Sequence, residues 1–383
     1  LCIPRQYHPE YVRLLLKNML EPCYGAGREK VRVYSFCNYL EFAMYVMEEA
    51  KGPRIFKREE LADRLGISSY KLDQILQDVA MDAELVNVDF SYYLDATTSW
   101  KKPFVRLDTD TYFCLDGRME GYAFYEVMFQ IIYAKRGSVF SKHQGKLLEQ
   151  MVYRMFREKH FPYITGEYRQ DGDLPERDCD MILEGNERVM FVELKKCPLP
   201  GSYEQANDVD VLSALGAGML YAQEQILWHK LRLKEKGVLA LYDKEGNHIQ
   251  DYTPGKKPVI AMSICMPEYD FLTDRMMTET FLESILRVTY HAIDPSQEKK
   301  LDKLNKRTEN IRMVTARLFD GMKYTTRDVF YNSLFRSLQQ VWTMLRVCDS
   351  LDAFLDMSET QLLMITGAGD VYVDILNALK LKG

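Results

Sequence analysis

The feature that most constrains this chain is the stretch from Asp178 to Lys195, which reads DCDMILEGNERVMFVELK. It holds two acids, a short apolar run, a Gly-Asn pair, a second apolar run and a final Glu-Leu-Lys. Two apolar runs of strand length on either side of Gly-Asn predict a β-hairpin. The register of that hairpin decides which of its polar side chains share a face.

The register can be counted from the sequence. Side chains alternate along a strand, so Glu193 and Lys195 share one face of the sheet. The loop is expected to be either the Gly-Asn pair alone or this pair with one neighbour on each side. Both loops place Asp180 opposite Phe191 and therefore on the Glu193 face, whereas an odd loop length would put it on the other face. The Gly-Asn pair favours the even register.

Two carboxylates and an amine on one face suit the hydrolysis of a phosphodiester. Such a reaction needs a hard divalent cation, Mg²⁺ or Mn²⁺, held by one or two carboxylates while phosphate and water complete the coordination. We expect Asp180 and Glu193 to supply those oxygens, with the carbonyl of Leu194 as a further ligand. Lys195 would orient or deprotonate the attacking water and offset charge on phosphorus. Asp178 is a rival carboxylate on the same strand.

A Glu-x-Lys triplet alone carries no information, because the chain contains three of them. The copies at 49–51 and 298–300 lie in charged stretches that are predicted to be helical. Only the copy at 193–195 ends a strand-like run and has an Asp upstream, at position 180. The alternative is an ordinary hairpin whose Glu and Lys form a solvent-facing ion pair.

This segment resembles the PD-(D/E)XK nuclease superfamily, whose core runs helix, three strands, helix, strand. The flanking sequence predicts the other pieces: a helix over 138–159, a strand over 161–169, a helical stretch over 203–234, and strands over 238–242 and 258–265. The resemblance implies an α/β fold class with a mixed-sheet, restriction-endonuclease-like core. Cys179 stands where the family has Pro, and the following helix lacks the Gln-x-x-x-Tyr of an exonuclease branch.

The helix predicted before the three strands offers one more acid. Apolar residues fill one half of its helical wheel, and Glu149 falls just off the edge of that half. Many members of the superfamily carry a metal-linked Glu on this helix, so the resemblance implies that Glu149 is a supporting ligand. A solvated helix glutamate is the alternative.

The N-terminal third resembles a helix-turn-helix. Between Phe56 and Leu76, two amphipathic stretches are separated by Gly66, and Ser68 is placed to cap the second helix. Alternating segments near 85–93 and 104–115 would be the strands of a winged helix. The side chains that would then face a DNA major groove are Ser69, Tyr70, Lys71 and Gln74. A structural or protein-binding role for this module is the alternative.

The C-terminus resembles the helix-hairpin-helix class, including the C-terminal domain of the RNA polymerase alpha subunit. Gly367 and Gly369 would form the hairpin and leave backbone N–H groups for a phosphate. However, residues 349–374 contain six acids and no Lys or Arg. A packing or protein-docking role is therefore favoured for this end.

Length and charge bound the remaining interpretation. A chain of 383 residues is too long for one hydrophobic core of ordinary size. We predict three domains: a helical and winged-helix-like module at 1–137, the nuclease-like domain at 138–270 and a helical domain at 271–383. The net charge of −6 argues against a general nucleic-acid coat, but residues 296–346 hold eleven Lys or Arg against five Asp or Glu. That run is either a nucleic-acid contact or a solvated helix face.

Eight scattered cysteines without Cys-x-x-Cys predict free thiols in a reducing cytoplasm rather than a zinc site. No membrane span is predicted, because the apolar stretches are broken by charges. The whole pattern predicts a Mg²⁺- or Mn²⁺-dependent nuclease acting on DNA rather than RNA, as a homodimer or with a partner subunit. By analogy alone, such a nuclease would serve in restriction, phage defence or the processing of mobile-element DNA. The alternatives are a DNA-binding regulator with an inactive nuclease fold and an interaction subunit of a larger complex.

Overall fold

The computed structural model describes residues 6–24, 30–88, 102–197, 207–364 and 367–382. The chain divides into two compact units, Leu1–Met151 and Val152–Gly383, where the sequence predicts three domains. Both units combine helices with a sheet, which confirms the mixed α/β class. Helix α5 (Gly121–Glu158) contains both the predicted domain boundary after residue 137 and the observed unit boundary after Met151. Gly137 interrupts the helix with φ 54° and ψ −138°. Among the described residues, no helix is long and apolar enough to cross a membrane.

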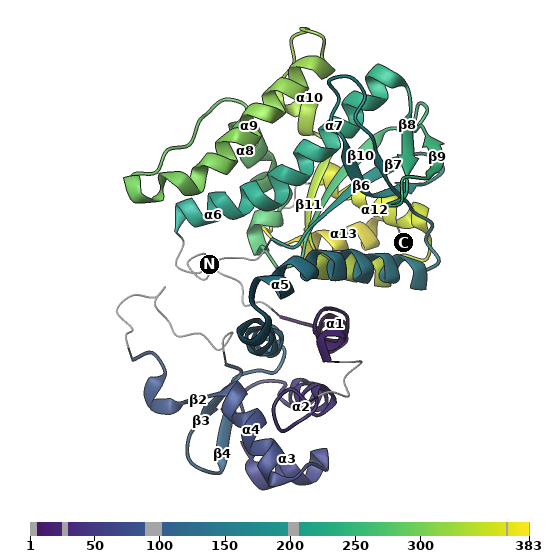
Figure 1. Ribbon diagram of the computed structural model, residues 1–383. Coiled ribbons are helices and arrows are strands. Elements are labelled where there is room, and N and C mark those ends of the chain that lie inside the picture. Colours follow the sequence, from purple (N-terminus) through teal and green to yellow (C-terminus); the bar gives the residue numbers. More distant parts are fainter. Residues whose placement is uncertain (1–5, 25–29, 89–101, 198–206, 365–366, 383) are drawn as a thin grey trace. The chain divides into compact units, whose positions relative to one another are not determined.

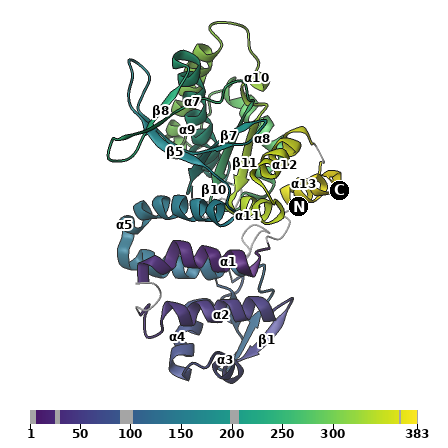
Figure 2. The same cartoon turned by 90° about the vertical axis from the view of Figure 1, so that its right-hand side faces the viewer.

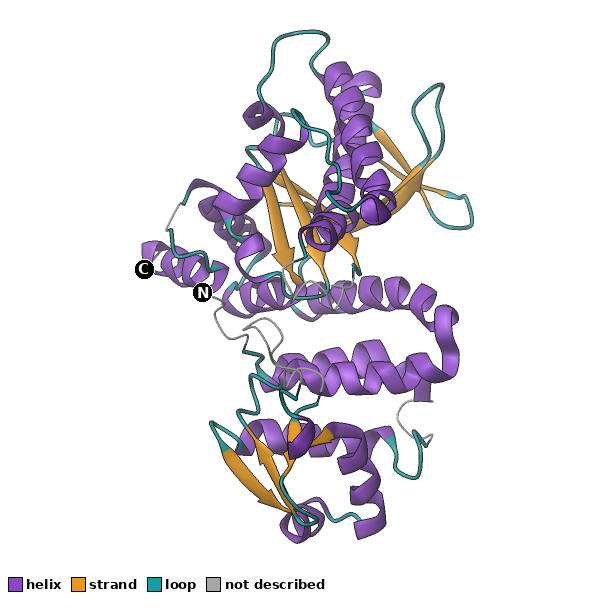
Figure 3. Cartoon of the chain, turned by 90° about the vertical axis from the view of Figure 1, so that its left-hand side faces the viewer, coloured by secondary structure: helices purple, strands orange, loops and turns teal. Residues whose placement is uncertain are grey.

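The first unit holds helices beside a small four-stranded sheet, drawn in orange in Figure 3. The strands lie in the order β1-β4-β3-β2. Its helices besides α5 are α1 (Pro9–Leu15), α2 (Phe36–Glu49), α3 (Arg58–Leu65) and α4 (Ser69–Val79), and its strands are β1 (Arg54–Lys57), β2 (Ala80–Asp82), β3 (Phe104–Arg106) and β4 (Thr111–Cys114).

The predicted helix-turn-helix is present as α3 and α4. Gly66 closes α3 in the left-handed region at φ 60°, and Leu72, Ile75 and Leu76 of α4 are buried. Ser68 stands at the N-cap of α4, but its side chain makes no capping hydrogen bond, so that part of the prediction is wrong. Strands β3 and β4 pair antiparallel within the predicted 104–115 wing.

The other predicted wing strand differs. Residues 83–85 form a short 3-10 helix after β2, and positions 89–93 lie outside the described residues.

The second unit is built on a seven-stranded sheet in the order β11-β10-β7-β6-β5-β8-β9. Strand β10 runs parallel to both β7 and β11, and the other pairs are antiparallel. The strands are β5 (Ile164–Tyr168), β6 (Arg177–Glu184), β7 (Val189–Lys195), β8 (Leu239–Tyr242), β9 (His248–Tyr252), β10 (Val259–Cys265) and β11 (Ser333–Ser337).

Helices cover this sheet, with α7 on one side and α12 on the other (Figures 1 and 2). Ile182 and Phe191 of the hairpin pack with Ile226 of α7 in one apolar cluster. Burying each of these large side chains contributes about 2 kcal/mol to folding. The helices of this unit after α5 are α6 (Asp208–Leu215), α7 (Tyr221–Lys236), α8 (Arg275–Ile285), α9 (Glu298–Leu318), α10 (Thr326–Phe330), α11 (Leu338–Val347), α12 (Leu351–Leu363) and α13 (Val371–Lys382).

The sequence predicts a helical domain after residue 270, but the structure also contains a strand there. Its strand β11 pairs with β10 in parallel register and so completes the sheet of the second unit. The acids of α12 also have partners within the chain: Asp352 accepts from Asn186, and Asp356 and Glu359 pair with Arg188 at the tip of the β6–β7 hairpin. At least three of the six acids of this end therefore take part in contacts within the chain.

Candidate active site

The hairpin observed between β6 and β7 has a four-residue loop, residues 185–188. Its pairs run from Glu184↔Val189 to Met181↔Val192, so Ile182 lies opposite Phe191. The predicted pairing of Asp180 with Phe191 is therefore wrong by two residues. Because the side-chain period of a strand is also two, the shift leaves Asp180 on the Glu193 face.

The ladder between the two strands ends just before Asp180. The Asp180 carboxylate takes the place of the next ladder acceptor, because its Oδ2 accepts the backbone N–H of Leu194 at 2.7 Å. On the other side of β6, the pairing with β5 shifts register between Ile164 and Gly166, opposite Ile182 and Cys179. An irregularity of this kind re-aims side chains next to functional sites. The local backbone thus fixes where the Asp180 carboxylate lies.

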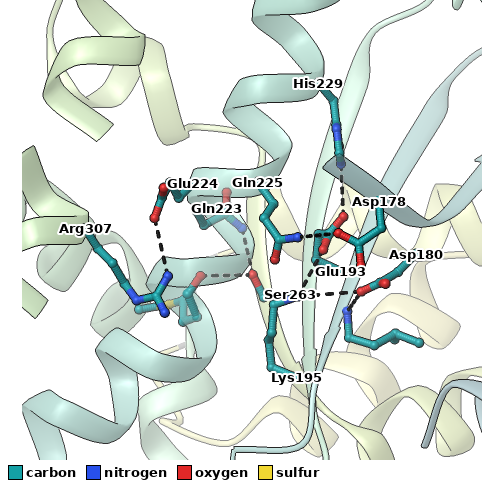
Figure 4. A network of polar contacts seen from close by, with 12 residues as sticks. Asp178, Asp180, Glu193, Lys195, Gln223, Glu224, Gln225, His229, Ser263 and Arg307 are labelled. Atoms are coloured by element: carbon teal, nitrogen blue, oxygen red, sulfur yellow. Dashed lines mark hydrogen bonds and ion pairs between the residues drawn. The ribbon is translucent and has the colours of Figure 1, made fainter. Parts of the chain in front are cut away.

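Asp180, Glu193 and Lys195 converge as the count of the register predicts (Figure 4). The Lys195 Nζ lies 3.0 Å from Glu193 Oε2 and 3.6 Å from Asp180 Oδ2. Glu193 is fully buried, Asp180 is 8% exposed and the Lys195 side chain is 13% exposed. The alternative of a solvent-facing ion pair is therefore wrong for this Glu-x-Lys.

Burial sets the ionisation of the cluster. It raises the pKa of Asp180 to about 7, and the neighbouring charge of Glu193 adds to the rise. Burial also raises the pKa of Glu193. For Lys195, burial works to lower the pKa, but the charges of Glu193 and Asp180 outweigh it and raise the pKa above its ordinary value. The raised pKa favours the ammonium form of Lys195, which donates to Glu193.

A histidine that the sequence analysis missed completes the buried cluster. His229 of α7 is fully buried and lies between two partners, with Nε2 3.0 Å from Glu193 Oε1 and Nδ1 2.9 Å from the Tyr168 hydroxyl. Burial lowers the pKa of His229 to about 3, so the ring is neutral. The tautomer that serves both contacts donates from Nε2 to Glu193 and accepts the Tyr168 O–H at Nδ1.

Gln225, one helical turn before His229, reaches the second acid of β6. Its Nε2 donates to Asp178 Oδ1 at 3.2 Å. Asp178 is exposed, unlike Asp180. The sequence signal for both helix residues was a Gln and a His four positions apart in the helix predicted after the hairpin, a spacing that puts them on one face.

Of the other predicted site residues, Leu194 contacts this cluster through its backbone N–H, which donates to Asp180. Glu149 is half-buried on α5, in the first unit and just before the boundary. The carbonyl of Leu194 remains a predicted ligand. On α4, Ser69 and Tyr70 are exposed, whereas Lys71 and Gln74 are half-buried; their contact with DNA also remains a prediction.

The donors present fit a hard divalent cation of the Mg²⁺ type. Oxygens of Asp180 and Glu193 already converge on one cationic atom, the Lys195 Nζ, so a cation placed between them would meet two hard ligands. Within the described part of the chain, no group of three or more His, Cys, Asp or Glu side chains could hold a metal. Mg²⁺ needs only one or two carboxylates together with water and phosphate.

An open hollow of about 390 Å³ lies along β5 and the β8–β9 loop. Neither Asp180, Glu193 nor Lys195 lines it, but Tyr168, the partner of His229, does. The hollow therefore does not contain the carboxylates of the cluster.

Comparisons with protein-family models, with curated proteins and with solved structures found no match for this chain. The functional interpretation therefore depends on the site itself.

Proposed function

We propose that this chain is a metal-dependent nuclease that hydrolyses phosphodiester bonds of nucleic acid, with Mg²⁺ or Mn²⁺ as its cofactor. The observation that carries the proposal is the convergence of Asp180, Glu193 and Lys195 within 3.6 Å at the end of a hairpin. Two buried carboxylates beside a lysine form the constellation that metal-assisted phosphodiester hydrolysis requires.

The order of elements supports the same proposal. The second half of α5, the strands β5, β6 and β7, the helix α7 and the strand β8 follow one another along the chain. This is the helix, three strands, helix, strand order that the PD-(D/E)XK resemblance implies. We therefore propose a restriction-endonuclease-like core, extended at the β7 edge by β10 and β11.

The residues would share the work as follows. Asp180 and Glu193 would hold the cation, which when bound supplies a Lewis acid and a more acidic water. Lys195 would orient that water and offset charge on the phosphate, since it is held as an ammonium. His229 would fix the Glu193 carboxylate through Oε1 and leave Oε2 toward the lysine. Glu149 is a further proposed ligand.

DNA is the proposed substrate. Internal cleavage is the proposed mode, because the Gln-x-x-x-Tyr of an exonuclease branch is absent from the sequence. Cutting a duplex takes two scissions, so a homodimer or a partner subunit is proposed as well. The cysteines of the described residues are free thiols. They support the proposed reducing, cytoplasmic location.

The test is a cleavage assay on the purified full chain. Supercoiled DNA, linear duplex, single-stranded DNA and RNA are each incubated with Mg²⁺, Mn²⁺ or EDTA. We expect cleavage of DNA that requires the metal and falls at least about a hundred-fold in Asp180→Asn and Lys195→Ala. Lys51→Ala, which removes the lysine of another Glu-x-Lys triplet, is the matched control and should cleave normally.

The other outcomes identify the alternatives. Binding of specific DNA without cleavage under any metal condition would favour a regulator with an inactive nuclease fold. Neither binding nor cleavage would favour an interaction subunit. Equal loss of activity in Lys51→Ala would show that the triplet at 193–195 has no special role.

A further inference from the structure

Two arginines beside the cluster are held by one buried carboxylate. Glu224 of α7 is 3% exposed, and its oxygens lie 3.6 Å from an Arg177 nitrogen and 3.4 Å from an Arg307 nitrogen. Asn310 of α9 donates to the same carboxylate at 3.1 Å. One acid therefore balances two guanidinium groups, and the group as a whole keeps a positive charge.

Both arginines are fixed in place and still reach solvent. Arg307 stacks over the ring of Tyr221, with Cζ 3.6 Å from the ring centroid, and Arg177 lies over Trp228 at 5.6 Å. Their side chains are 22% and 20% exposed. A guanidinium held this way is pre-organised to bind a phosphate through two hydrogen bonds.

The arginines adjoin the proposed catalytic residues. The Tyr221 ring over which Arg307 stacks also makes a cation–π contact with Lys195. The Lys195 Nζ lies 4.9 Å from the centroid of the Tyr221 ring. Arg177 is on β6, the strand that also carries Asp180. Figure 4 shows the pair of Arg307 and Glu224 in the same close view as the carboxylates. A phosphate bound by these arginines would therefore be a close neighbour of one at the metal site.

The positive charge continues along α9. Lys299, Lys303 and Lys306 are exposed, and no ion pair or hydrogen bond of the described residues engages them. With 3.6 residues per turn, all three point closer to the Arg307 side than Asp302 and Glu309 do. From Lys299 to Arg307 the helix rises about 12 Å, over which one DNA strand presents about three to four phosphates.

We propose that the phosphate backbone of the nucleic acid binds along this edge of α9, with Arg177 and Arg307 contacting the phosphates next to the one that is cleaved. The proposal deepens the nuclease function above and rests on it for the identity of the cleaved bond. The partner follows from charge complementarity, because the edge is a row of cations on a chain whose net charge is −6.

Binding is tested first, in EDTA, with a short fluorescein-labelled DNA duplex and a series of salt concentrations. We expect the triple variant Lys299→Gln, Lys303→Gln, Lys306→Gln to bind more weakly and to lower the slope of log affinity against log salt by about two to three. The control triple variant changes three exposed lysines of the same unit to Gln, at Lys244, Lys256 and Lys323. It should keep the slope of the unmodified protein.

Cleavage is tested second, with Arg307→Gln and Arg307→Lys. Loss of a charge-assisted phosphate contact should reduce kcat/KM ten- to hundred-fold in Arg307→Gln, with part recovered in Arg307→Lys. A structural role alone would lower thermal stability and leave kcat/KM of the folded fraction unchanged, which overturns the assignment of Arg307.

The two proposals fail in different ways. An unchanged salt slope in the α9 triple variant, with cleavage still dependent on Asp180, overturns the binding edge and leaves the nuclease. A reduced slope without any cleavage overturns the nuclease and leaves the edge as a nucleic-acid contact. Absence of DNA binding by the unmodified protein overturns the edge outright.

Discussion

Neutralising the Asp180 carboxylate should stabilise the metal-free protein at alkaline pH. Burial and the charge of Glu193 raise the pKa of Asp180 from 3.8 to about 7. A group whose pKa is raised on folding contributes stability that is complete below its unfolded pKa and is lost as pH rises through its folded pKa. At pH 8 the ionised carboxylate therefore lowers the free energy of unfolding, by up to about 4 kcal/mol.

Asp180→Asn removes this cost and keeps the local hydrogen bond. The amide oxygen of Asn can still accept the Leu194 N–H, which Asp180 now accepts at 2.7 Å. Lys195 keeps its ion pair with Glu193, in which the two charged atoms lie 3.0 Å apart. Because a buried amide has its own desolvation cost, we expect a gain of about 1 to 3 kcal/mol in the free energy of unfolding at pH 8.

The assay is urea unfolding in EDTA at pH 8 and pH 5, followed by tryptophan fluorescence. Two of the chain's three tryptophans, Trp228 and Trp342, lie in the second unit, so most of the signal reports on the unit that holds the site. The gain should shrink at pH 5, where Asp180 is already protonated in the folded protein. Asp302→Asn, an exposed aspartate of α9 in the same unit, is the control and should show no such gain.

Two results would refute this reasoning. Asp180→Asn being less stable than the unmodified protein at pH 8 would mean that the ion pair with Lys195 outweighs burial. An equal change at pH 5 and pH 8 would mean that the ionisation of Asp180 has no part in it. Mg²⁺ should stabilise the unmodified protein and not this variant.

Three further predictions follow from the second unit. Binding of Mg²⁺ must release the Asp180 proton, so the affinity measured by calorimetry should weaken up to about ten-fold per pH unit below 7 and should not be constant between pH 6 and 8. His229→Leu removes the donor to Glu193 and should raise the Mg²⁺ concentration for half-maximal cleavage about 10- to 100-fold; an unchanged requirement would contradict its positioning role. Arg336→Met leaves Gln361 Oε1 and the Thr273 carbonyl without their buried donor and should lower the free energy of unfolding in urea by about 3 kcal/mol, whereas a neutral effect would show that the site repacks.

The sequence predicted the hairpin, its face and three of its site residues because these depend on local rules. Alternation along a strand has a period of two, so an error of two residues in the register did not move Asp180 off the Glu193 face. The turn between α3 and α4 could also be predicted from the sequence, because Gly66 adopts a left-handed backbone conformation that favours glycine.

What the sequence did not show depends on residues that are far apart in the chain. Strand β11 is five residues long and has no strong alternation, and it is a strand because β10, about seventy residues earlier, offers it a parallel partner. The Tyr168 contact of His229 joins residues 61 positions apart, and the Glu224 contact of Arg307 joins residues 83 positions apart. Spacing along the chain carries no sign of such pairs.

By itself, then, the sequence determined which residue types could converge: two acids and a lysine on one face of a hairpin. Only the tertiary structure decided that they are buried, because burial comes from α7 packing over that face. This packing raises the pKa of Asp180 and brings His229 to Glu193. It also places Arg307 and Lys195 on the same Tyr221 ring. A local pattern fixes the direction of a side chain, whereas its ionisation and partners depend on the solvent that distant segments exclude.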